Sequence, residues 1–319
     1  MSLDARKPVR GYLYIAAATF FWGVAASVGR AAFTGRLPGM HALRPIEPLI
    51  LSQSRATFSF LVLLPFLGLV RGWRRLRISS ADLLQLLLIG ILGVAASNYF
   101  YYLAIQKTNV ATAIILQYTA PIWVLLYTVA RGLQRPTPQR VAAVGLAVAG
   151  IALVIGLFGS GGLRLNMIGI FAALLAAFSF AFYNLGGHDI LARHDRWTVL
   201  LYTTCSASLF WVLVNPPWKV AAAHYSGDQW LFLLLFSLIS VLAPFSFYFA
   251  GLQHLEPTRA IVVSCLEPVF SIVIAAVALG EVMRVLQVVG IVFVLAAIIV
   301  VQLPDRKSPK SVPLVEPIE

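Results

Sequence analysis

The sequence predicts an all-α membrane protein of ten transmembrane helices, arranged as two inverted five-helix repeats with both termini in the cytoplasm. Three observations carry this prediction: the composition, the lengths of the apolar runs and an internal repeat. Hydrophobic residues make up 60% of the chain, charged residues make up 11%, and the mean hydropathy is +0.87. Soluble domains carry about 25% charged residues, so the composition indicates a protein that crosses a membrane several times.

Ten apolar runs follow one another along the chain, separated by short connectors rich in glycine, proline and arginine. A helix of about 20 residues spans the ~30 Å hydrocarbon core of a bilayer, and most runs have about that length. No connector is long enough to hold a soluble domain. The runs cover residues 12–32, 48–70, 83–103, 110–130, 141–158, 167–187, 198–214, 231–252, 260–279 and 286–303.

The distribution of Lys and Arg between the connectors predicts the orientation. With the N-terminus in the cytoplasm, the cytoplasmic segments contain 16 of the 24 basic residues and the opposite side contains 6. Cytoplasmic loops carry the excess of basic residues in membrane proteins. This topology accounts for the net charge of +12. It also argues against nucleic-acid binding, which needs basic residues gathered on one folded surface.

An internal repeat relates the two halves of the chain. A shift of 158 residues places Trp22 on Phe180, and a shift of 147 places Pro121 on Pro268. Each half contains five crossings, an odd number, so the second half must lie upside down relative to the first. Inverted repeats hold a substrate site near the midplane and support alternating access. We expect a first repeat, a second repeat and a disordered cytoplasmic tail over residues 1–160, 161–303 and 304–319.

Several short motifs lie in a fixed order along the chain. They are an aromatic residue in the first run of each half, Arg55 in the second run, Tyr-x-x-Tyr-Leu-Ala from Tyr99, Glu267-Pro268 in the ninth, and Gly280-Glu281 followed by Gln287 and Gly290. In this order the chain resembles the EamA-type members of the drug/metabolite transporter superfamily over about residues 11–303. It looks most like the YddG-type amino-acid exporters. The resemblance implies a ten-helix bundle in the bacterial inner membrane that exports amino acids or related metabolites.

Glu267 is the acidic residue that lies well inside an apolar run. A charge at that depth costs at least ~2.5 kcal/mol, so we expect it to face the bundle interior with a partner. It could bind a proton that drives transport, or it could hydrogen-bond backbone groups that Pro268 leaves unpaired. The Glu-Pro pair of the family occurs in members with unlike substrates, which favours the structural role. Ser264 and Ser271 are expected on the same helix face.

Arg55 lies about seven residues inside the start of the second run. It could bind a substrate carboxylate, pair with Glu267, or extend its side chain to the membrane surface. Its long side chain and shallow depth favour the last two alternatives. Pro121 and Pro268 occupy equivalent places in the two halves, and they are either bending points for alternating access or static kinks.

The substrate cavity is expected to be largely apolar and aromatic, with few charges. Such a wall favours broad selectivity and weak affinity. Three of the candidate residues, Asn98, Tyr99 and Tyr102, lie in the final turns of their run, where aromatic residues also serve as interfacial anchors. The residues expected to line the cavity are Trp22, Asn98, Tyr99, Tyr102, Gln117, Tyr118, Phe180 and Ser264.

The remaining motifs argue against other classes of function. The histidines show no metal-ligand spacing, Cys205 and Cys265 lie in separate runs, and no Gly-x4-Gly-Lys-Ser/Thr phosphate loop is present. We therefore expect no cofactor, no metal and no ATP-binding motif in this chain. A lipid-modifying enzyme would need clustered acidic and histidine side chains, and only His188, Asp189 and His194 approach one. The chain is predicted to be a secondary transporter that exports amino acids, with other small metabolites or drugs as the alternative.

Overall fold

The computed structural model describes residues 8–33, 46–108, 110–155, 166–279 and 284–303. Every regular element in these residues is a helix, which confirms the all-α prediction. The expected tail 304–319 and the Gly280-Glu281 pair lie outside the described residues. In chain order the elements are α1 (Pro8–Phe33), α2 (Pro48–Arg71), η2 (Trp73–Leu76), α3 (Ser80–Leu88), η3 (Ile89–Ala95), α4 (Ala96–Lys107), α5 (Val110–Gln117), α6 (Ala120–Ala130), α7 (Pro138–Val154), α8 (Met167–Ile190), α9 (Arg196–Val214), α10 (Pro217–Ala221), α11 (Gly227–Ser237), η4 (Leu238–Leu242), α12 (Ala243–Leu252), α13 (Pro257–Ser264), α14 (Leu266–Leu279) and α15 (Val285–Gln302).

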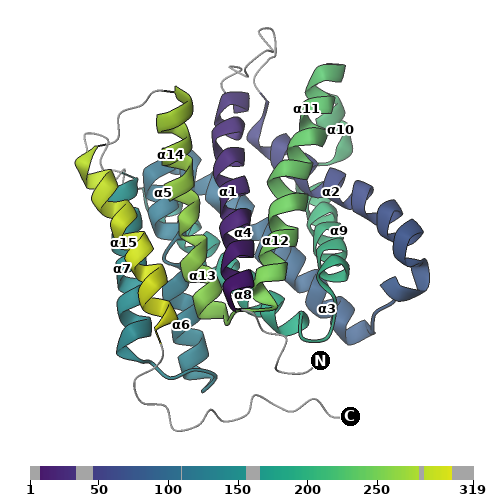
Figure 1. Ribbon diagram of the computed structural model, residues 1–319. Coiled ribbons are helices and arrows are strands. Elements are labelled where there is room, and N and C mark those ends of the chain that lie inside the picture. Colours follow the sequence, from purple (N-terminus) through teal and green to yellow (C-terminus); the bar gives the residue numbers. More distant parts are fainter. Residues whose placement is uncertain (1–7, 34–45, 109, 156–165, 280–283, 304–319) are drawn as a thin grey trace.

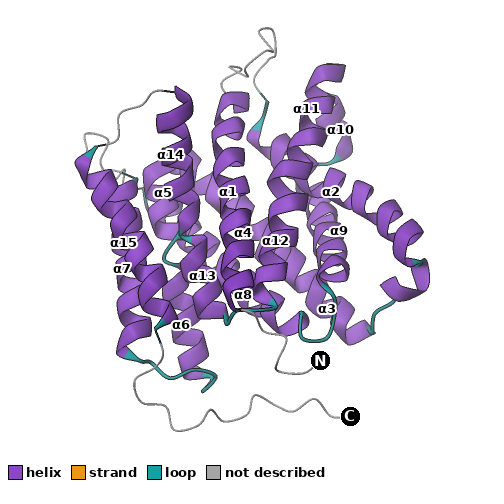
Figure 2. Cartoon of the chain, viewed as in Figure 1, coloured by secondary structure: helices purple, strands orange, loops and turns teal. Residues whose placement is uncertain are grey.

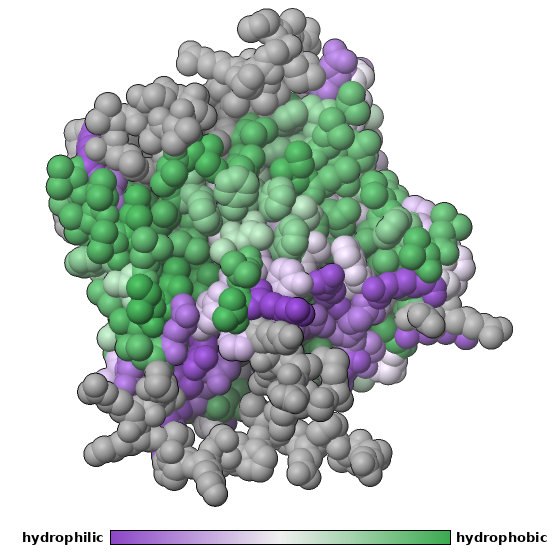
Figure 3. Space-filling model, in the orientation of Figure 1, coloured by the Kyte–Doolittle hydropathy of each residue, from purple (hydrophilic) through white to green (hydrophobic). Residues whose placement is uncertain are grey.

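The long helices run side by side in one bundle (Figures 1 and 2). Among the described residues, seven helical stretches are long and apolar enough to cross a membrane, and α7 is a shorter apolar helix. Leu69 and Leu213 are 83% and 82% exposed, as expected for side chains that face lipid. Figure 3 shows a broad hydrophobic band with hydrophilic residues gathered below it. The protein is therefore a multi-pass membrane protein.

Two of the long stretches contain a π-helical segment near their middle. One stretch runs through α3, η3 and α4, and the other runs through α11, η4 and α12. A π-helical turn holds one more residue than an α-helical turn, and such segments are frequent at functional sites. These stretches correspond to the third predicted run of each half, so the distortion recurs at equivalent positions.

Two other predicted runs are interrupted just before a proline. The run 110–130 forms α5 and α6, and the run 260–279 continues from α13 into α14. Pro121 and Pro268 therefore lie in the first turn of α6 and α14, where the missing N–H of proline removes no helical hydrogen bond. A turn at the residues between the two helices restarts each of them, next to the prolines that were expected to bend or kink these runs.

Helices from early and late parts of the chain pack closely. A Cβ atom at Gly150 of α7 would lie 2.9 Å from the carbonyl oxygen of Gly290 of α15, and one at Gly290 would lie 2.6 Å from the carbonyl oxygen of Gly150. Gly251 of α12 likewise leaves space for Ile15 of α1. Small residues let helix backbones approach in membrane proteins. The two halves therefore share one interior.

A cluster of charged and amide side chains joins α3 to the connector between α8 and α9. Asp82 accepts hydrogen bonds from Arg193 Nε at 3.1 Å and lies 2.9 Å from His194 Nε2. Gln85 donates to Asp189 at 2.8 Å, and Arg193 also pairs with Asp189 at 3.3 Å. We name these five residues the Asp82 cluster. His194 and Asp189 thus belong to a network of ion pairs that holds connectors together.

A second cluster joins the connector between α6 and α7 to the start of α13. Glu256 accepts from Arg140 Nη2 at 3.2 Å and from Gln134 Nε2 at 3.3 Å. Thr258 Oγ1 donates to Gln134 Oε1 at 2.7 Å. We name these four residues the Glu256 cluster. Connectors from distant parts of the sequence are therefore fastened to each other in two places.

Asp195 begins α9 and pairs with Arg71 at the end of α2. Its carboxylate also accepts from the Trp197 N–H at 3.0 Å and from Thr198 Oγ1 at 2.7 Å. Burial by itself would raise the pKa of Asp195. The hydrogen bonds from Thr198 and Trp197, together with Arg71, outweigh burial and hold the pKa of Asp195 below its ordinary value.

Candidate functional site

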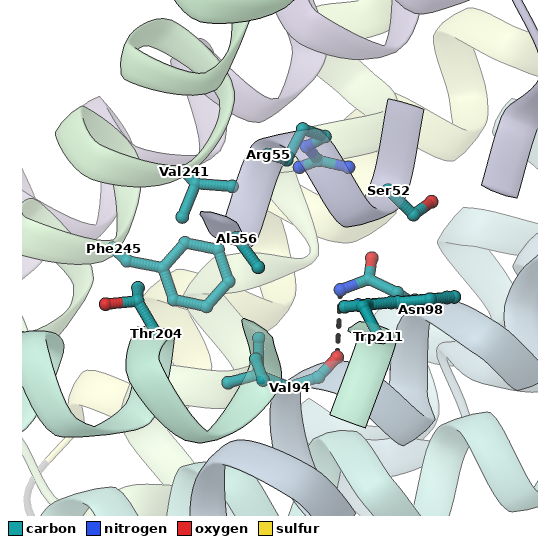
Figure 4. Close-up of a pocket in the computed structure, with 10 residues that line it drawn as sticks. Ser52, Arg55, Ala56, Val94, Asn98, Thr204, Trp211, Val241 and Phe245 are labelled. Atoms are coloured by element: carbon teal, nitrogen blue, oxygen red, sulfur yellow. Dashed lines mark hydrogen bonds between the residues drawn. The ribbon is translucent and has the colours of Figure 1, made fainter. Parts of the chain in front are cut away.

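A small cavity lies between helices from both halves of the chain (Figure 4). Its volume is about 20 Å³, which gives room for about one water molecule. Arg55 and Ser52 lie on one side of it, and Val94 and Thr204 lie on the opposite side. The wall is formed by α2, η3 and α4 together with α9, η4 and α12. The lining residues are Ser52, Arg55, Ala56, Val94, Asn98, Thr204, Ala207, Trp211, Val241 and Phe245.

The side chain of Arg55 reaches from α2 to the π-helical segment η4. Its Nε atom donates to Ser240 Oγ at 2.9 Å, and its Nη2 atom donates to the carbonyl oxygen of Ser240 at 2.9 Å. In an α-helix that carbonyl would accept from the N–H of residue 244, but Pro244 has none. Arg55 therefore supplies the donor that the proline lacks. The guanidinium carbon also lies 5.8 Å from the ring centre of Phe236, within range of a cation–π interaction.

The Nη1 group of Arg55 has no partner among the residues that the structure describes. The same contacts include no ion pair between Arg55 and Glu267. The guanidinium is bound to η4 instead of extending towards the membrane surface. Since the lining of the cavity contains no aspartate or glutamate, Arg55 is the charged group of this wall.

Asn98 lies opposite η4 and is held by the other π-helical segment. Its Nδ2 atom donates to the carbonyl oxygen of Val94 in η3 at 2.8 Å. Its Oδ1 atom accepts no hydrogen bond from any described residue, and it points towards the side of the cavity where Arg55 lies (Figure 4). The two polar groups that the sequence singled out in α2 and α4 thus reach one cavity.

Two aromatic side chains complete the wall, and two predicted site residues support them from behind. Trp211 is 1% exposed, and the ring of Tyr99 lies 6.4 Å from its ring. The ring of Phe245 lies 5.3 Å from Trp22 and 5.5 Å from Tyr183. Tyr99 and Trp22 were expected to line the cavity. They lie one layer further out, against Trp211 and Phe245.

Glu267 binds a tyrosine away from this cavity. Tyr118 Oη donates to Glu267 Oε2 at 2.7 Å, and Ser271 Oγ donates to the Glu267 carbonyl oxygen at 3.1 Å. Ser264 Oγ donates to the carbonyl oxygen of Ile261 at 2.7 Å. Because the helix restarts after Ser264, the regular spacing that was expected to place Ser264 and Glu267 on one face does not apply.

Three more predicted site residues lie outside the cavity lining. Gln117 Nε2 donates to Ser97 Oγ at 3.5 Å. The ring of Phe180 lies 6.4 Å from the ring of Tyr248 in the apolar core. Tyr102 is partly buried beside Tyr101, at 5.7 Å between ring centres.

Sequence reasoning missed the hydroxyl groups and the aromatic pair of the cavity. The polar run 52–54 within an apolar helix was a signal that could have identified Ser52, and Thr203 with Thr204 gave a similar signal in α9. Trp211 had no such signal, since many other aromatic residues occur in apolar runs.

The cavity presents one guanidinium and one amide oxygen within apolar and aromatic walls, and Ser52 and Thr204 also line it. A few polar groups in a mostly apolar lining are typical of sites for small molecules. Among the residues searched, no group of three or more His, Cys, Asp or Glu side chains could hold a metal ion. The polar side chains that line the cavity can recognise a ligand by charge and by hydrogen bonds.

Comparisons with known proteins point to membrane transporters. The model of the EamA-like transporter family matches residues 9–156 and again residues 167–303. The uncharacterized inner membrane transporter YicL of Salmonella typhimurium is 24% identical over 275 residues, covering 82% of this chain and 91% of YicL. The threonine/homoserine exporter RhtA of Escherichia coli is 28% identical over 260 residues, covering 80% and 82% of the two chains.

Two further matches extend this result. An uncharacterized transporter of Archaeoglobus fulgidus is 25% identical over 248 residues, covering 77% of this chain and 83% of its own. A solved crystal structure with 21% identity superposes with a TM-score of 0.75 and covers 93% of this chain and 98% of that chain. At that identity the superposition supports the fold alone.

Proposed function

The chain belongs to the EamA-like transporter family, and from that membership we propose that it exports amino acids across the bacterial inner membrane by alternating access. The threonine/homoserine exporter RhtA is among its relatives, and YicL is an inner membrane transporter. The observation that carries the proposal is the cavity between the two matched stretches of the chain, with one cationic and several neutral polar groups. A zwitterion with a short side chain suits such a lining.

The proposed architecture is ten crossings in two inverted repeats, with both termini in the cytoplasm. The repeats are residues 1–160 and 161–303, followed by a cytoplasmic tail over 304–319. Four observations support it: two separate family matches, a π-helical segment in the third run of each half, an interrupted fourth run in each half, and the excess of basic residues on one side.

Alternating access places mechanical demands on particular elements. Opening the cavity to the cytoplasm requires the Asp82 cluster and the Glu256 cluster to separate, because both fasten connectors of different halves on the proposed cytoplasmic side. The restarts of the helix before Pro121 and Pro268 are proposed as the bending points. A helix without continuous hydrogen bonds bends at lower energy than an intact one.

The proposed substrate contacts are Arg55 and Asn98. Trp22 and Tyr99 shape the walls through Phe245 and Trp211. The other residues expected at the site, Tyr102, Gln117, Tyr118, Phe180 and Ser264, are proposed to meet substrate in conformations with a larger opening. A lining with one charge suits several amino acids and binds each of them weakly.

Glu267 is proposed to have a structural role. Its carboxylate is bound by Tyr118 Oη at 2.7 Å, and this contact joins α14 to the turn between α5 and α6. A buried acceptor that loses such a partner costs roughly 1–3 kcal/mol. The alternative is a proton-binding role that drives export.

Counterflow in proteoliposomes tests the function. Vesicles are loaded with one unlabelled amino acid at a time, and uptake of a labelled amino acid is followed without an ion gradient. Saturable exchange by several amino acids is the expected result. A folded protein that exchanges none would remove the amino-acid assignment and direct the search to other metabolites or lipids.

A Glu267→Gln arm of the same experiment addresses proton coupling. The structural role predicts that folded Glu267→Gln protein keeps wild-type transport across pH, because the amide oxygen still accepts from Tyr118. Loss of the pH dependence of transport in this variant would establish Glu267 as a proton site instead.

A further inference from the structure

Arg55 has donors that its structural contacts do not use. A guanidinium carries five N–H groups. One on Nε and one on Nη2 bind Ser240. The two on Nη1, and the second on Nη2, have no partner among the described residues. The contact with Ser240 therefore fixes the plane of the group while leaving one edge available.

The charge of Arg55 is not balanced within the cavity. The lining contains no carboxylate. Glu267 is bound to Tyr118 and interacts with Arg55 through space, without an ion pair between them. Ionisable residues between membrane-spanning helices are costly unless they are paired, and they mark substrate pathways. A cation with free donors and no directly paired carboxylate is suited to an anionic group of a ligand, which would bind those donors.

Asn98 offers the complementary group on the facing wall. Its Nδ2 is held by the Val94 carbonyl at 2.8 Å, so its Oδ1 is fixed as an acceptor directed towards the side of Arg55 (Figure 4). An ammonium group carries three donors and no acceptor. The free N–H donors of Arg55 suit the carboxylate of an α-amino acid, and the free Asn98 Oδ1 on the facing wall suits the ammonium of the same molecule.

We propose that Arg55 binds the α-carboxylate of the transported amino acid through its Nη1 edge, while Asn98 Oδ1 accepts a hydrogen bond from the α-ammonium. This inference rests on the proposed function and adds the rule by which substrates are selected. The free α-carboxylate is required, and amines that lack it are rejected. The side chain of the substrate faces Trp211 and Phe245, so its size is limited by how far those rings move apart.

Arginine suits this role better than lysine would. Its planar fork matches a carboxylate with two parallel hydrogen bonds, whereas an ammonium acts as a point charge. Hydrogen bonds to charged groups are stronger than neutral ones by enough to change an affinity by about 10-fold. Loss of the fork is therefore measurable as a change in substrate preference.

The experiment compares amino acids with their amino alcohols in counterflow. L-Alanine, L-threonine and L-phenylalanine are each tested against alaninol, threoninol and phenylalaninol as competitors of a labelled amino acid that the wild type exchanges. The wild type is expected to prefer each acid over its alcohol by at least about 10-fold. Arg55→Gln should remove most of this preference, a reduction of about 10-fold, and Arg55→Lys should reduce it by less.

The acid-to-alcohol ratio separates recognition from a structural role. If Arg55 only supports η4, Arg55→Gln weakens exchange of acids and alcohols alike and the ratio stays at its wild-type value, which overturns the proposal. Arg55→Lys keeps a positive charge near η4 and provides the comparison if the Gln variant does not fold. Lys219→Gln, which removes an exposed positive charge on α10, is the matched control and should leave the ratio unchanged.

Failure of the wild type has two distinct forms. A wild type that exchanges amino acids and amino alcohols equally overturns the role of Arg55 but leaves amino-acid transport intact. A folded wild type that exchanges no amino acid overturns the proposed function, and this inference with it.

Discussion

The two π-helical segments occupy corresponding places and are stabilised by different means. Both lie within a long apolar helical stretch, and each contributes one residue to the cavity, Val94 from η3 and Val241 from η4. In η4 the cause is chemical, because Pro244 withholds a backbone donor and Arg55 replaces it. η3 contains no proline, and it instead packs closely against α8 and α9.

Close packing around η3 depends on two glycines. A Cβ atom at Gly90 would lie 1.7 Å from Ser206 Oγ and 2.5 Å from the carbonyl oxygen of Thr203, both in α9. A Cβ atom at Gly93 would lie 2.9 Å from Tyr183 Cβ in α8. Ser206 Oγ also donates to the Leu86 carbonyl oxygen at 3.4 Å, at the end of α3. A missing donor and a close helix contact thus lead to the same local geometry.

Among the substitutions that test this difference, Gly90→Ala is expected to lower the stability of the protein most. The new methyl group would overlap the Thr203 carbonyl oxygen of α9 as well as Ser206, so η3 or α9 must move. Overpacking of this kind costs about 3 kcal/mol. Thermal unfolding of the purified protein in detergent should show a clear loss of stability.

Gly145→Ala is the matched control for that measurement. Gly145 lies in α7 with nothing within 4 Å of the position that its Cβ would take. Alanine favours a helix over glycine by roughly 0.5–1 kcal/mol, so this variant should be unchanged or slightly more stable. If Gly90→Ala and Gly145→Ala changed the unfolding temperature by the same amount, close packing would not be what stabilises η3.

The chemical cause assigned to η4 can be tested by combining Pro244→Ala with Arg55→Gln. Alanine at 244 supplies the N–H that the Ser240 carbonyl lacks, so Arg55 is no longer needed as its donor. Arg55→Gln should then destabilise the Pro244→Ala protein less than the wild type, with a coupling of about 1 kcal/mol. The four proteins of this cycle are compared by unfolding in detergent, and additive effects would contradict the assignment.

Asp195→Asn is expected to have the smallest effect of these substitutions. Asp195 and Arg71 join α9, which carries Ser206, to α2, which carries Arg55. Both side chains are partly exposed, so the loss should be about 0.5 kcal/mol.

The effect of Asp195→Asn should also depend on pH. Because the pKa of Asp195 lies below its ordinary value, its contribution to stability is complete above pH ~4 and is lost as the pH falls through the lower, folded-state pKa. Unfolding temperatures measured from pH 6 downward should converge for the Asp195→Asn variant and the wild-type protein at the acid end. A constant difference between the two proteins at every pH would contradict this origin.

Much of the fold could be predicted from the sequence because membrane insertion constrains composition so strongly. Apolar runs of sufficient length gave the helical class and the membrane crossings, and Pro121 and Pro268 indicated where two helices depart from regularity. The π-helical segment in 83–103 could not be predicted. It contains no proline, and the glycines that permit it have meaning only beside Ser206 and Tyr183.

The side chains that follow this segment differ in what they contact. One extra residue in a helical turn rotates Asn98, Tyr99 and Tyr102 together about the helix axis, and the neighbouring helices decide which of them reaches the cavity. Asn98 faces the cavity, whereas Tyr99 packs behind Trp211 and Tyr102 lies elsewhere. Arg55 could be identified from its charge, but its orientation depends on Pro244, which is almost 190 residues away in the sequence.

The size of the cavity has a kinetic consequence. A space of about 20 Å³ admits a water molecule and not an amino acid, so helices must part before each substrate enters. Collective helix motions take microseconds to milliseconds, and such steps limit the turnover of many proteins that close around a ligand. For the proposed export we therefore expect the maximal rate to be set by the frequency with which α2 and α9 separate, and substitutions that loosen their contact should change that rate at saturating substrate.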